Sequence, residues 1–151
     1  MTTIAYRDKV MAADRLMNWS GVKAKTTKIV RAGNALIGAA GSAQDAGTFI
    51  RWWESGADLG SLPEIRQYGD GDAPNFEILV LRPGPRLTLY TQHFQPVDLE
   101  EDFWAIGSGA KAAMGAMHMG ASAEKAVEVA AMVDCYTGGR VQVERLEVAE
   151  Y

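Results

Sequence analysis

Short apolar runs separated by turn residues dominate the first part of the chain. Two runs flank Arg7-Asp8, and a second pair flanks Ala32-Gly33-Asn34. Runs of this length that are bounded by Gly, Asn or Asp are typical of β-hairpins. Small and β-branched residues occupy both faces of these strands, so we expect the sheets to lie between other layers. The pattern predicts strands over residues 3–6, 9–14, 27–31 and 35–40.

Helical periodicity takes over at three places. Ser42 precedes an apolar pattern with helical spacing over residues 43–54 and is suited to cap that helix. Two more helices are predicted over residues 110–119 and 123–135. The apolar side of the first helix is expected to carry Phe49, Ile50 and Trp53.

The remaining pattern indicates the fold class. Residues 56–75 are rich in Gly, Asp and Pro, with a short helix near residues 62–68. Hairpins, one helix, more hairpins, a helix pair and a final strand do not alternate as β-α-β units do. This order predicts an α+β fold in which helices cover antiparallel sheets, as one domain over residues 1–151. The later strands are predicted over residues 76–81, 87–91, 103–109 and 140–146.

Composition narrows the functional classes. The chain is 48% hydrophobic and 23% charged, with a net charge of −4. Its basic residues are scattered, which argues against nucleic acid as a partner. No apolar run approaches the roughly 18 residues of a membrane span, and residues 2–15 lack a signal-peptide pattern, so we expect no membrane partner and a cytoplasmic location. Cys135 is the only cysteine and is expected to point into the core.

Six motifs follow one another along nearly the whole chain. They are Thr2-Thr3-Ile4, Ala12-Ala13-Asp14, Lys28-Ile29-Val30-Arg31, Ala40-Gly41-Ser42-Ala43-Gln44-Asp45, Ala105-Ile106-Gly107-Ser108-Gly109 and Asp134-Cys135-Tyr136-Thr137-Gly138-Gly139. In their order and spacing they resemble proteasome β subunits and their bacterial relative HslV. The resemblance implies a four-layer α-β-β-α sandwich of the N-terminal nucleophile hydrolase type, with a shortened central helical region between Gly56 and Pro74.

Thr2 is the nucleophile that this resemblance implies, once Met1 has been removed. Methionine before a small residue such as threonine is normally removed by methionine aminopeptidase. A threonine hydroxyl is a weak nucleophile until a base takes its proton. The free α-amino group of the same residue, with an ordinary pKa of about 7.7–8.0, can serve as that base. The expected activity is a threonine endopeptidase that degrades peptides or unfolded proteins.

The resemblance also implies a charged pair beside Thr2. Lys28 is expected to place its positive charge next to the hydroxyl, where it favours an alkoxide, and Asp14 is expected to balance that charge. Taken singly, each residue has an ordinary structural explanation. Lys28 is one of three lysines within a few positions, and Asp14 lies where a turn is predicted.

Four further residues complete the implied catalytic set. Ser108 and Asp134 are expected to hold the α-amino group and orient the water, and Thr137 stands where the family has serine. The Gly41 amide is the implied oxyanion donor, because glycine lets a substrate carbonyl approach the backbone closely. Outside the resemblance, Ser108 is also suited to cap a helix and Asp134 to end one.

The implied substrate pocket is small and uncharged. Val30, Ala39 and Ala43 are expected to line the pocket for the side chain before the scissile bond. These residues favour apolar substrate side chains. No organic cofactor is required, although the family resemblance implies a structural cation, Na⁺ or Mg²⁺, held by main-chain oxygens at Ala131, Asp134 and Thr137.

The implied assembly is a homo-oligomeric ring or double ring that hides Thr2 in a chamber, with an ATP-dependent unfoldase as a possible partner. Two alternatives stay open on the sequence. A chain that retains Met1 has no free amine to act as base, and would be a non-catalytic structural ring subunit. A monomer that has an open active site and does not cleave peptides would be an N-terminal nucleophile amidase acting on small molecules.

Overall fold

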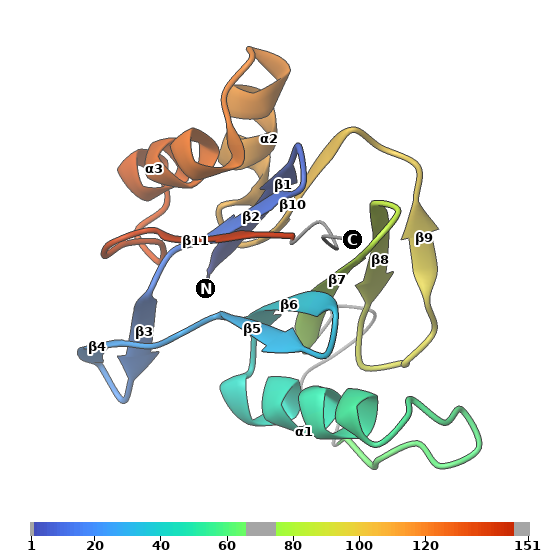
Figure 1. Ribbon diagram of the computed structural model, residues 1–151. Helices are drawn as coiled ribbons and strands as arrows, with labels where there is room; N and C mark the ends of the chain where they lie inside the picture. The colour runs from blue at the N-terminus through green and yellow to red at the C-terminus, as the bar shows by residue number, and fades with distance from the viewer. Residues whose placement is uncertain (1, 66–74, 147–151) are drawn as a thin grey trace.

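Two antiparallel sheets that face each other form the centre of the molecule (Figure 1). The computed structural model describes residues 2–65 and 75–146. The four-stranded sheet has the order β10 (Phe103–Gly107), β1 (Thr3–Arg7), β2 (Val10–Ala13), β11 (Gln142–Arg145). The five-stranded sheet has the order β5 (Ile29–Ala32), β6 (Ala35–Gly41), β7 (Phe76–Arg82), β8 (Arg86–Tyr90), β9 (Val97–Leu99). A separate hairpin pairs β3 (Leu16–Trp19) with β4 (Val22–Lys25).

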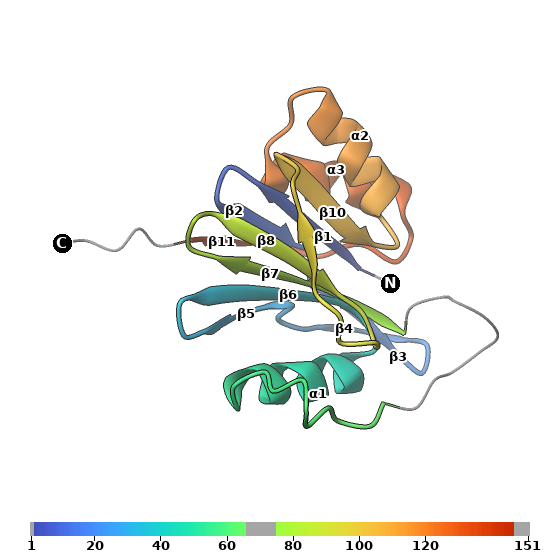
Figure 2. The ribbon, with the colours of Figure 1, turned by 90° about the vertical axis from the view of Figure 1, so that its right-hand side faces the viewer.

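Helices cover the outer faces of both sheets (Figure 2). α1 (Ala43–Glu54) packs on the five-stranded sheet, whereas α2 (Ala110–His118) and α3 (Ala123–Val133) pack on the four-stranded sheet. The predicted combination of antiparallel sheets with covering helices is therefore confirmed. Among the described residues, no helix is long and apolar enough to cross a membrane.

Large apolar side chains fill the space between the two sheets. Gly38 on β6 lies against this layer, where a Cβ atom would come within 2.7 Å of Met11 Sδ and 2.8 Å of Ile4 Cγ2. Only glycine lets the sheets approach so closely at this point. The packing fixes the distance between the strand pairs β1–β2 and β5–β6, which both lead into the candidate site. Other buried members of the layer are Leu36, Leu79 and Ile106.

Helix α1 begins where the sequence predicts, but its buried face is shifted. The Ser42 hydroxyl accepts a hydrogen bond from the Asp45 N–H over 3.3 Å, which caps the helix. Ile50 and Trp53, predicted on the apolar side of this helix, pack against the aromatic cluster but are only half-buried. Trp52 is buried, because its ring packs against those of Phe49, Tyr90 and Phe94. The buried side chains of α1 are Ala46, Phe49 and Trp52.

The sequence pattern does not predict the β3–β4 hairpin or β9. The hairpin leaves two large apolar side chains, Trp19 and Val22, 59% and 66% exposed, so it lacks the alternation of a half-buried strand. Its turn at Ser20-Gly21 has positive φ at both residues, 52° and 81°, as a tight hairpin turn requires. The short helix expected near residues 62–68 is absent over residues 62–65, and the rest of that range lies outside the described residues.

Candidate active site

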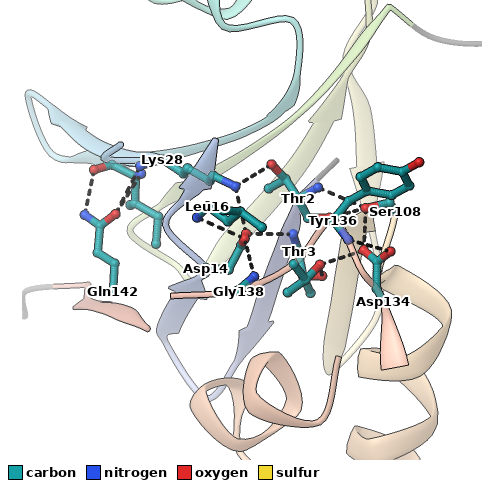
Figure 3. Close-up of polar contacts among 12 residues, drawn as sticks. Thr2, Thr3, Asp14, Leu16, Lys28, Ser108, Asp134, Tyr136, Gly138 and Gln142 are labelled. Atoms are coloured by element: carbon teal, nitrogen blue, oxygen red, sulfur yellow. Dashed lines mark hydrogen bonds and ion pairs between the residues drawn. The ribbon is translucent and has the colours of Figure 1, made fainter. Parts of the chain in front are cut away.

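The start of β1 and the end of β2 bring Thr2 and Asp14 together (Figure 3). In this antiparallel pair the N–H of Asp14 donates to the carbonyl oxygen of Thr3 over 3.2 Å. Lys28 comes from the other sheet, directly before β5. Three residues that are distant in sequence therefore meet at one end of the space between the sheets.

The ammonium group of Lys28 bridges the other two side chains. Its Nζ donates to Thr2 Oγ1 over 2.7 Å and to Asp14 Oδ1 over 2.9 Å. Only 6% of the Lys28 side chain and 1% of the Asp14 side chain are exposed. Burial lowers the pKa of Lys28 below its ordinary value, and the hydrogen bond and charge of Asp14 oppose part of that shift. A hydroxyl thus lies against a positive charge that water hardly screens.

Asp14 is held by backbone groups as well as by lysine. Its Oδ1 also accepts from the N–H of Thr3 over 3.0 Å. Its Oδ2 accepts from the N–H groups of Leu16 and Gly138, over 3.3 Å and 3.0 Å. The backbone therefore fixes the position of the carboxylate and leaves it directed at Lys28.

A second chain of hydrogen bonds begins at the nitrogen of Thr2. The Thr2 N–H donates to Ser108 Oγ over 3.0 Å, and Ser108 Oγ donates to Asp134 Oδ2 over 2.5 Å. The hydroxyl of Thr137 donates to the same carboxylate oxygen over 2.7 Å and lies 2.8 Å from the Thr3 hydroxyl. Thr2 follows Met1 in this chain, so its nitrogen is a peptide group here. Loss of Met1 would convert that nitrogen into an amine beside a serine hydroxyl.

Asp134, the carboxylic acid in this series of hydrogen bonds, has a pKa below its ordinary value. Burial alone would raise the pKa of Asp134, but the hydrogen bonds from Ser108 and Thr137 and from the Tyr136 N–H together lower it below its ordinary value. Asp134 is the C-cap residue of α3, and its backbone N–H donates to the Ala130 carbonyl oxygen, so the end of that helix determines the position of the carboxylate. It can therefore accept from Ser108 without competing for a proton near neutral pH.

Two glycines are required by the closeness of these groups. A Cβ atom at Gly107 would overlap the carbonyl oxygen of Thr2, and one at Gly109 would overlap the hydroxyl of Thr3. Gly41 is required for a different reason. Its φ is +104°, and a Cβ atom there would lie 2.5 Å from the carbonyl oxygen of Asn75. Steric clashes with a Cβ atom therefore require glycine at these positions of the motifs.

A cavity of about 400 Å³ opens beside Thr2 and Lys28. Its walls come from the end of β6, from the first turns of α1 and from the β3–β4 hairpin. All three residues predicted to form the substrate pocket, Val30, Ala39 and Ala43, line it together with Gly41. Its other lining residues are Leu16, Met17, Asn18, Trp19, Thr26, Thr27, Ser42, Gln44, Ala46, Gly47 and Ile50.

The structure brings the predicted catalytic residues into one connected site. Thr2, Lys28 and Asp14 form one part, Ser108, Asp134 and Thr137 form the other, and Gly41 borders the cavity. Sequence reasoning missed Thr3 and Gln142. The Thr2-Thr3 motif contained a signal for Thr3, whose N–H and hydroxyl join the two parts. Nothing in the sequence pattern distinguished Gln142, which hydrogen-bonds the backbone of Lys28 and Ile29.

The predicted cation positions offer main-chain oxygens and little else. Ala131 lies in the last turn of α3, where carbonyl groups lack partners within the helix. The carbonyl oxygen of Asp134 already accepts from the Thr137 N–H over 3.1 Å. Among the described residues no three His, Cys, Asp or Glu side chains gather as a metal site. A cation here would therefore depend on carbonyl ligands, which fit Na⁺ or Mg²⁺ better than a transition metal.

The prediction for Cys135 is wrong. Its side chain is exposed and not in the core. α3 ends at Val133, and the following residues turn back toward Asp14, so Cys135 lies on the outer side of that turn beside Tyr136. The thiol takes no part in the hydrogen bonds of the site.

Comparisons with known proteins place the fold but not the family. No protein-family model matches the sequence, and no curated protein matches it. Solved structures do resemble it. BPH of Thiobacillus denitrificans in complex with epoxomicin has a TM-score of 0.67 and 22% sequence identity, over 97% of this chain and 99% of that chain. BPH of the same organism, without that compound named, has a TM-score of 0.66 and 23% identity, over 97% and 98%. The chain therefore shares a fold with these proteins over nearly its whole length.

Proposed function

We propose that this chain is a threonine endopeptidase of the proteasome β and HslV kind, with Thr2 as its nucleophile after removal of Met1. The observation that carries the proposal is the 2.7 Å contact between the Lys28 ammonium and the Thr2 hydroxyl. A positive charge held against a hydroxyl lowers the free energy of the alkoxide that attack requires. Asp14 balances that charge inside the protein.

The order of helices and sheets supports the same conclusion. α2 and α3 cover one sheet and α1 covers the other, as expected for a four-layer α-β-β-α sandwich (Figure 2). We propose that this is the N-terminal nucleophile hydrolase fold, with the reacting residue at the start of β1. The structural neighbour from Thiobacillus denitrificans was solved with epoxomicin. That compound is a peptide epoxyketone, so it is a natural probe for this chain.

The reaction would begin at the α-amine that Thr2 gains when Met1 is removed. The amine takes the proton of the Thr2 hydroxyl, directly or through a water, and the oxygen attacks the substrate carbonyl carbon. The substrate C–N bond then breaks, and the amine gives its proton to the leaving nitrogen. An ester now joins Thr2 to the acyl part of the peptide. A water activated by the same amine hydrolyses this ester and restores the free hydroxyl.

The neighbouring groups have matching roles in this mechanism. Ser108 Oγ, 3.0 Å from the Thr2 nitrogen, would orient the amine, and Asp134 would hold the serine hydroxyl in place. Thr137 donates to the same carboxylate and so limits its rotation. The Gly41 N–H, at the edge of the cavity, is proposed to donate to the oxyanion of the tetrahedral intermediate.

The cavity supports a preference for apolar substrate side chains. Among the described residues that line it, Lys28 is the only one with a charged side chain, and its charge is balanced by Asp14. Val30, Ala39 and Ala43 are small or short apolar residues and leave room for a bulkier substrate side chain. An acidic or basic substrate side chain would find no opposite charge to replace its lost water.

Assembly into a ring or double ring in the cytoplasm is part of the same proposal, with an ATP-dependent unfoldase as the possible partner. Large apolar side chains are unusually exposed at the ends of α2 and α3, where Met119, Met132 and Val133 are 89%, 81% and 73% exposed. We propose that these side chains contact neighbouring subunits in such a ring.

Hydrolysis of fluorogenic peptides tests the proposed function. The wild-type protein and Thr2→Ser, which keeps a hydroxyl and a small second residue, are expected to cleave peptides with apolar residues before the scissile bond. Thr2→Ala is expected to be inactive and to keep the same fold. Activity that survives in Thr2→Ala would rule out Thr2 as the nucleophile. A protein that retains Met1 and cleaves nothing would favour the structural ring subunit.

A further inference from the structure

Gln142 connects the edges of the two sheets next to the site. It is the first residue of β11, the edge strand of the four-stranded sheet, and its side chain is directed at β5, the edge strand of the other sheet. Its Oε1 accepts from the N–H groups of Lys28 and Ile29, each over 3.2 Å. Its Nε2 donates to the carbonyl oxygen of Ile29 over 3.0 Å (Figure 3).

The amide of Gln142 takes the place of a neighbouring strand. An edge strand has N–H and C=O groups that no further strand pairs. In an antiparallel ladder a residue exchanges both of these groups with one partner residue. Gln142 satisfies both groups of Ile29 with a single side chain, because an amide offers a donor and an acceptor together. Gln142 is only 6% exposed, so these hydrogen bonds lie away from water. The loss of a hydrogen bond there leaves a buried polar group without a partner, which lowers stability more than it would at the surface.

The same contacts fix the backbone of Lys28. Its N–H donates to Gln142, and its carbonyl oxygen accepts from the Ala39 N–H of β6 over 3.0 Å. Gln142 in turn lies opposite Ala13 in the β11–β2 ladder, one residue before Asp14. The backbone of Lys28 is thereby tied to the strand that carries its ion-pair partner.

We propose that Gln142 is a positioning residue that holds the Lys28 ammonium on the Thr2 hydroxyl, a role that rests on the proposed function for its effect on rate. Without the amide, the segment before β5 loses its link to β11, and the backbone of Lys28 keeps only its hydrogen bond to Ala39 of β6. A displacement of about 1 Å at a reacting group can lower a rate by up to roughly 100-fold. The substrate cavity is held differently, since Val30 pairs with Ile37 in the β5–β6 ladder.

The chain offers a matched control for this effect. Glu144, two residues along β11, also links the two sheets, through an ion pair of 3.2 Å with Arg31 on β5. That link is partly exposed and does not contact Lys28. Glu144→Gln removes its charge and leaves the Gln142 amide in place. Glu144→Gln therefore removes a cross-sheet ion pair away from the site, while Arg31 keeps its 2.7 Å bond to the carbonyl oxygen of Arg145. A Gln142→Met variant removes the cross-sheet hydrogen bonds at the site.

Two readouts test the proposal on the full-length protein. The first is peptide hydrolysis at saturating and limiting substrate. Gln142→Met is expected to lower kcat about 10- to 100-fold with KM changed less than about twofold, whereas Glu144→Gln keeps the wild-type values. Gln142→Leu, which also lacks the amide donor and acceptor, serves the same comparison if Gln142→Met does not fold. Wild-type kcat in a folded Gln142 variant, or a loss confined to KM, would overturn the positioning role.

The second readout does not depend on activity. The 15Nζ resonance of Lys28 reports the environment of its ammonium group and is expected to shift in Gln142→Met and to stay in place in Glu144→Gln. An unchanged resonance in Gln142→Met overturns the proposal. If the wild-type protein cleaves no peptide, the proposed function fails, and this resonance alone decides whether Gln142 positions Lys28.

Discussion

Lys28 and Asp14 form a buried ion pair of 2.9 Å that joins segments adjacent to two different sheets. Asp14 follows β2 of the four-stranded sheet, and Lys28 precedes β5 of the five-stranded sheet. The attraction between the charges therefore acts across the layer in which Thr2 lies. Removing either partner leaves the other charge in a site that was formed for two. Removing Asp14 and removing Lys28 should lower stability by different amounts, because the Asp14 carboxylate also accepts hydrogen bonds from backbone N–H groups.

Asp14→Ala is expected to lower the free energy of unfolding by about 2 kcal/mol more than Lys28→Met does. Loss of the carboxylate removes the acceptor of two backbone N–H groups, those of Thr3 and Gly138, whereas the Leu16 N–H keeps the Gly138 carbonyl oxygen. A buried donor without a partner costs about 1–3 kcal/mol. Urea unfolding of both variants at neutral pH measures the difference.

The partly exposed pair between Arg31 and Glu144 is the control for that comparison. Glu144→Gln is expected to change the free energy of unfolding by less than about 1 kcal/mol, as exposed ion pairs contribute little. Equal losses in Asp14→Ala and Lys28→Met would contradict the idea that Asp14 organises the surrounding backbone.

The proton of Lys28 should set the alkaline limit of activity. Burial lowers the pKa of this ammonium below its ordinary 10.5, with part of the shift opposed by Asp14. We expect the rate of Thr2 acylation to fall on the alkaline side at a pH below 10.5, as the positive charge is lost. The pH dependence of stability has the opposite sign. Between the two pKa values the unfolded chain binds more protons, so this residue makes the free energy of unfolding rise with pH.

Single-turnover rates across the alkaline range measure that limit. Lys28→Arg places a group that stays protonated at the same position, and any activity it retains should lack this alkaline fall. A fall in rate that is identical in wild type and Lys28→Arg would assign the limit to another group.

Ser108 and Thr137 should keep Asp134 ionised at a more acidic pH than an ordinary aspartate. Their hydrogen bonds lower its pKa below the ordinary value of 3.8 despite the opposing effect of burial. The stability that Asp134 contributes is therefore fully present above pH 3.8 and is lost as pH falls through the lower folded-state pKa. Ser108→Ala is expected to move this pKa upward.

Titration of the carboxyl 13C resonances follows Asp134 directly. Asp98 is the internal reference, since its own pKa is lowered by hydrogen bonds from Arg86 and Thr88. These three residues belong to the five-stranded sheet, whereas Ser108 follows β10 of the four-stranded sheet. A pKa of Asp134 that is the same in wild type and Ser108→Ala would show that the serine does not support the carboxylate.

Ala39→Leu is expected to change which peptides are cleaved. Ala39 lines the cavity beside Thr2, and three added carbon atoms would fill part of its volume of about 400 Å³. Substrates with large apolar side chains before the scissile bond should lose kcat/KM by roughly 10-fold or more, while those with alanine should change little. A fluorogenic peptide panel measures both. An equal change for large and small side chains would place the substrate side chain elsewhere.

Much of this fold could be predicted from local patterns. The limits of α1 and the cap at Ser42 follow from a helical period and one hydroxyl. Turn residues mark the β1–β2 and β5–β6 hairpins clearly. The motif order also identified the residues that meet at Thr2, because each carries a side-chain type that the chemistry needs.

The rest depends on contacts that have no local pattern. The three N–H groups on Asp14 are backbone atoms and leave no trace in residue identity. The β3–β4 hairpin is too exposed to alternate between apolar and polar positions. Gln142 looks like an ordinary polar residue of a half-exposed strand, and only the approach of β5 makes it a partner of Ile29. Cys135 was misjudged for a related reason, since the direction of a turn after α3 cannot be inferred from composition.

The central claim is that Thr2, freed of Met1, is the nucleophile. The intact mass of the purified protein, before and after exposure to a peptide epoxyketone such as epoxomicin, tests it most directly. We expect a mass that lacks Met1, then a gain of one whole inhibitor, because the hydroxyl and the amine of Thr2 both add to it without a leaving group. Thr2→Ala should lose Met1 as well and gain nothing. Retained Met1 with no adduct, or an adduct that persists in Thr2→Ala, would contradict the claim.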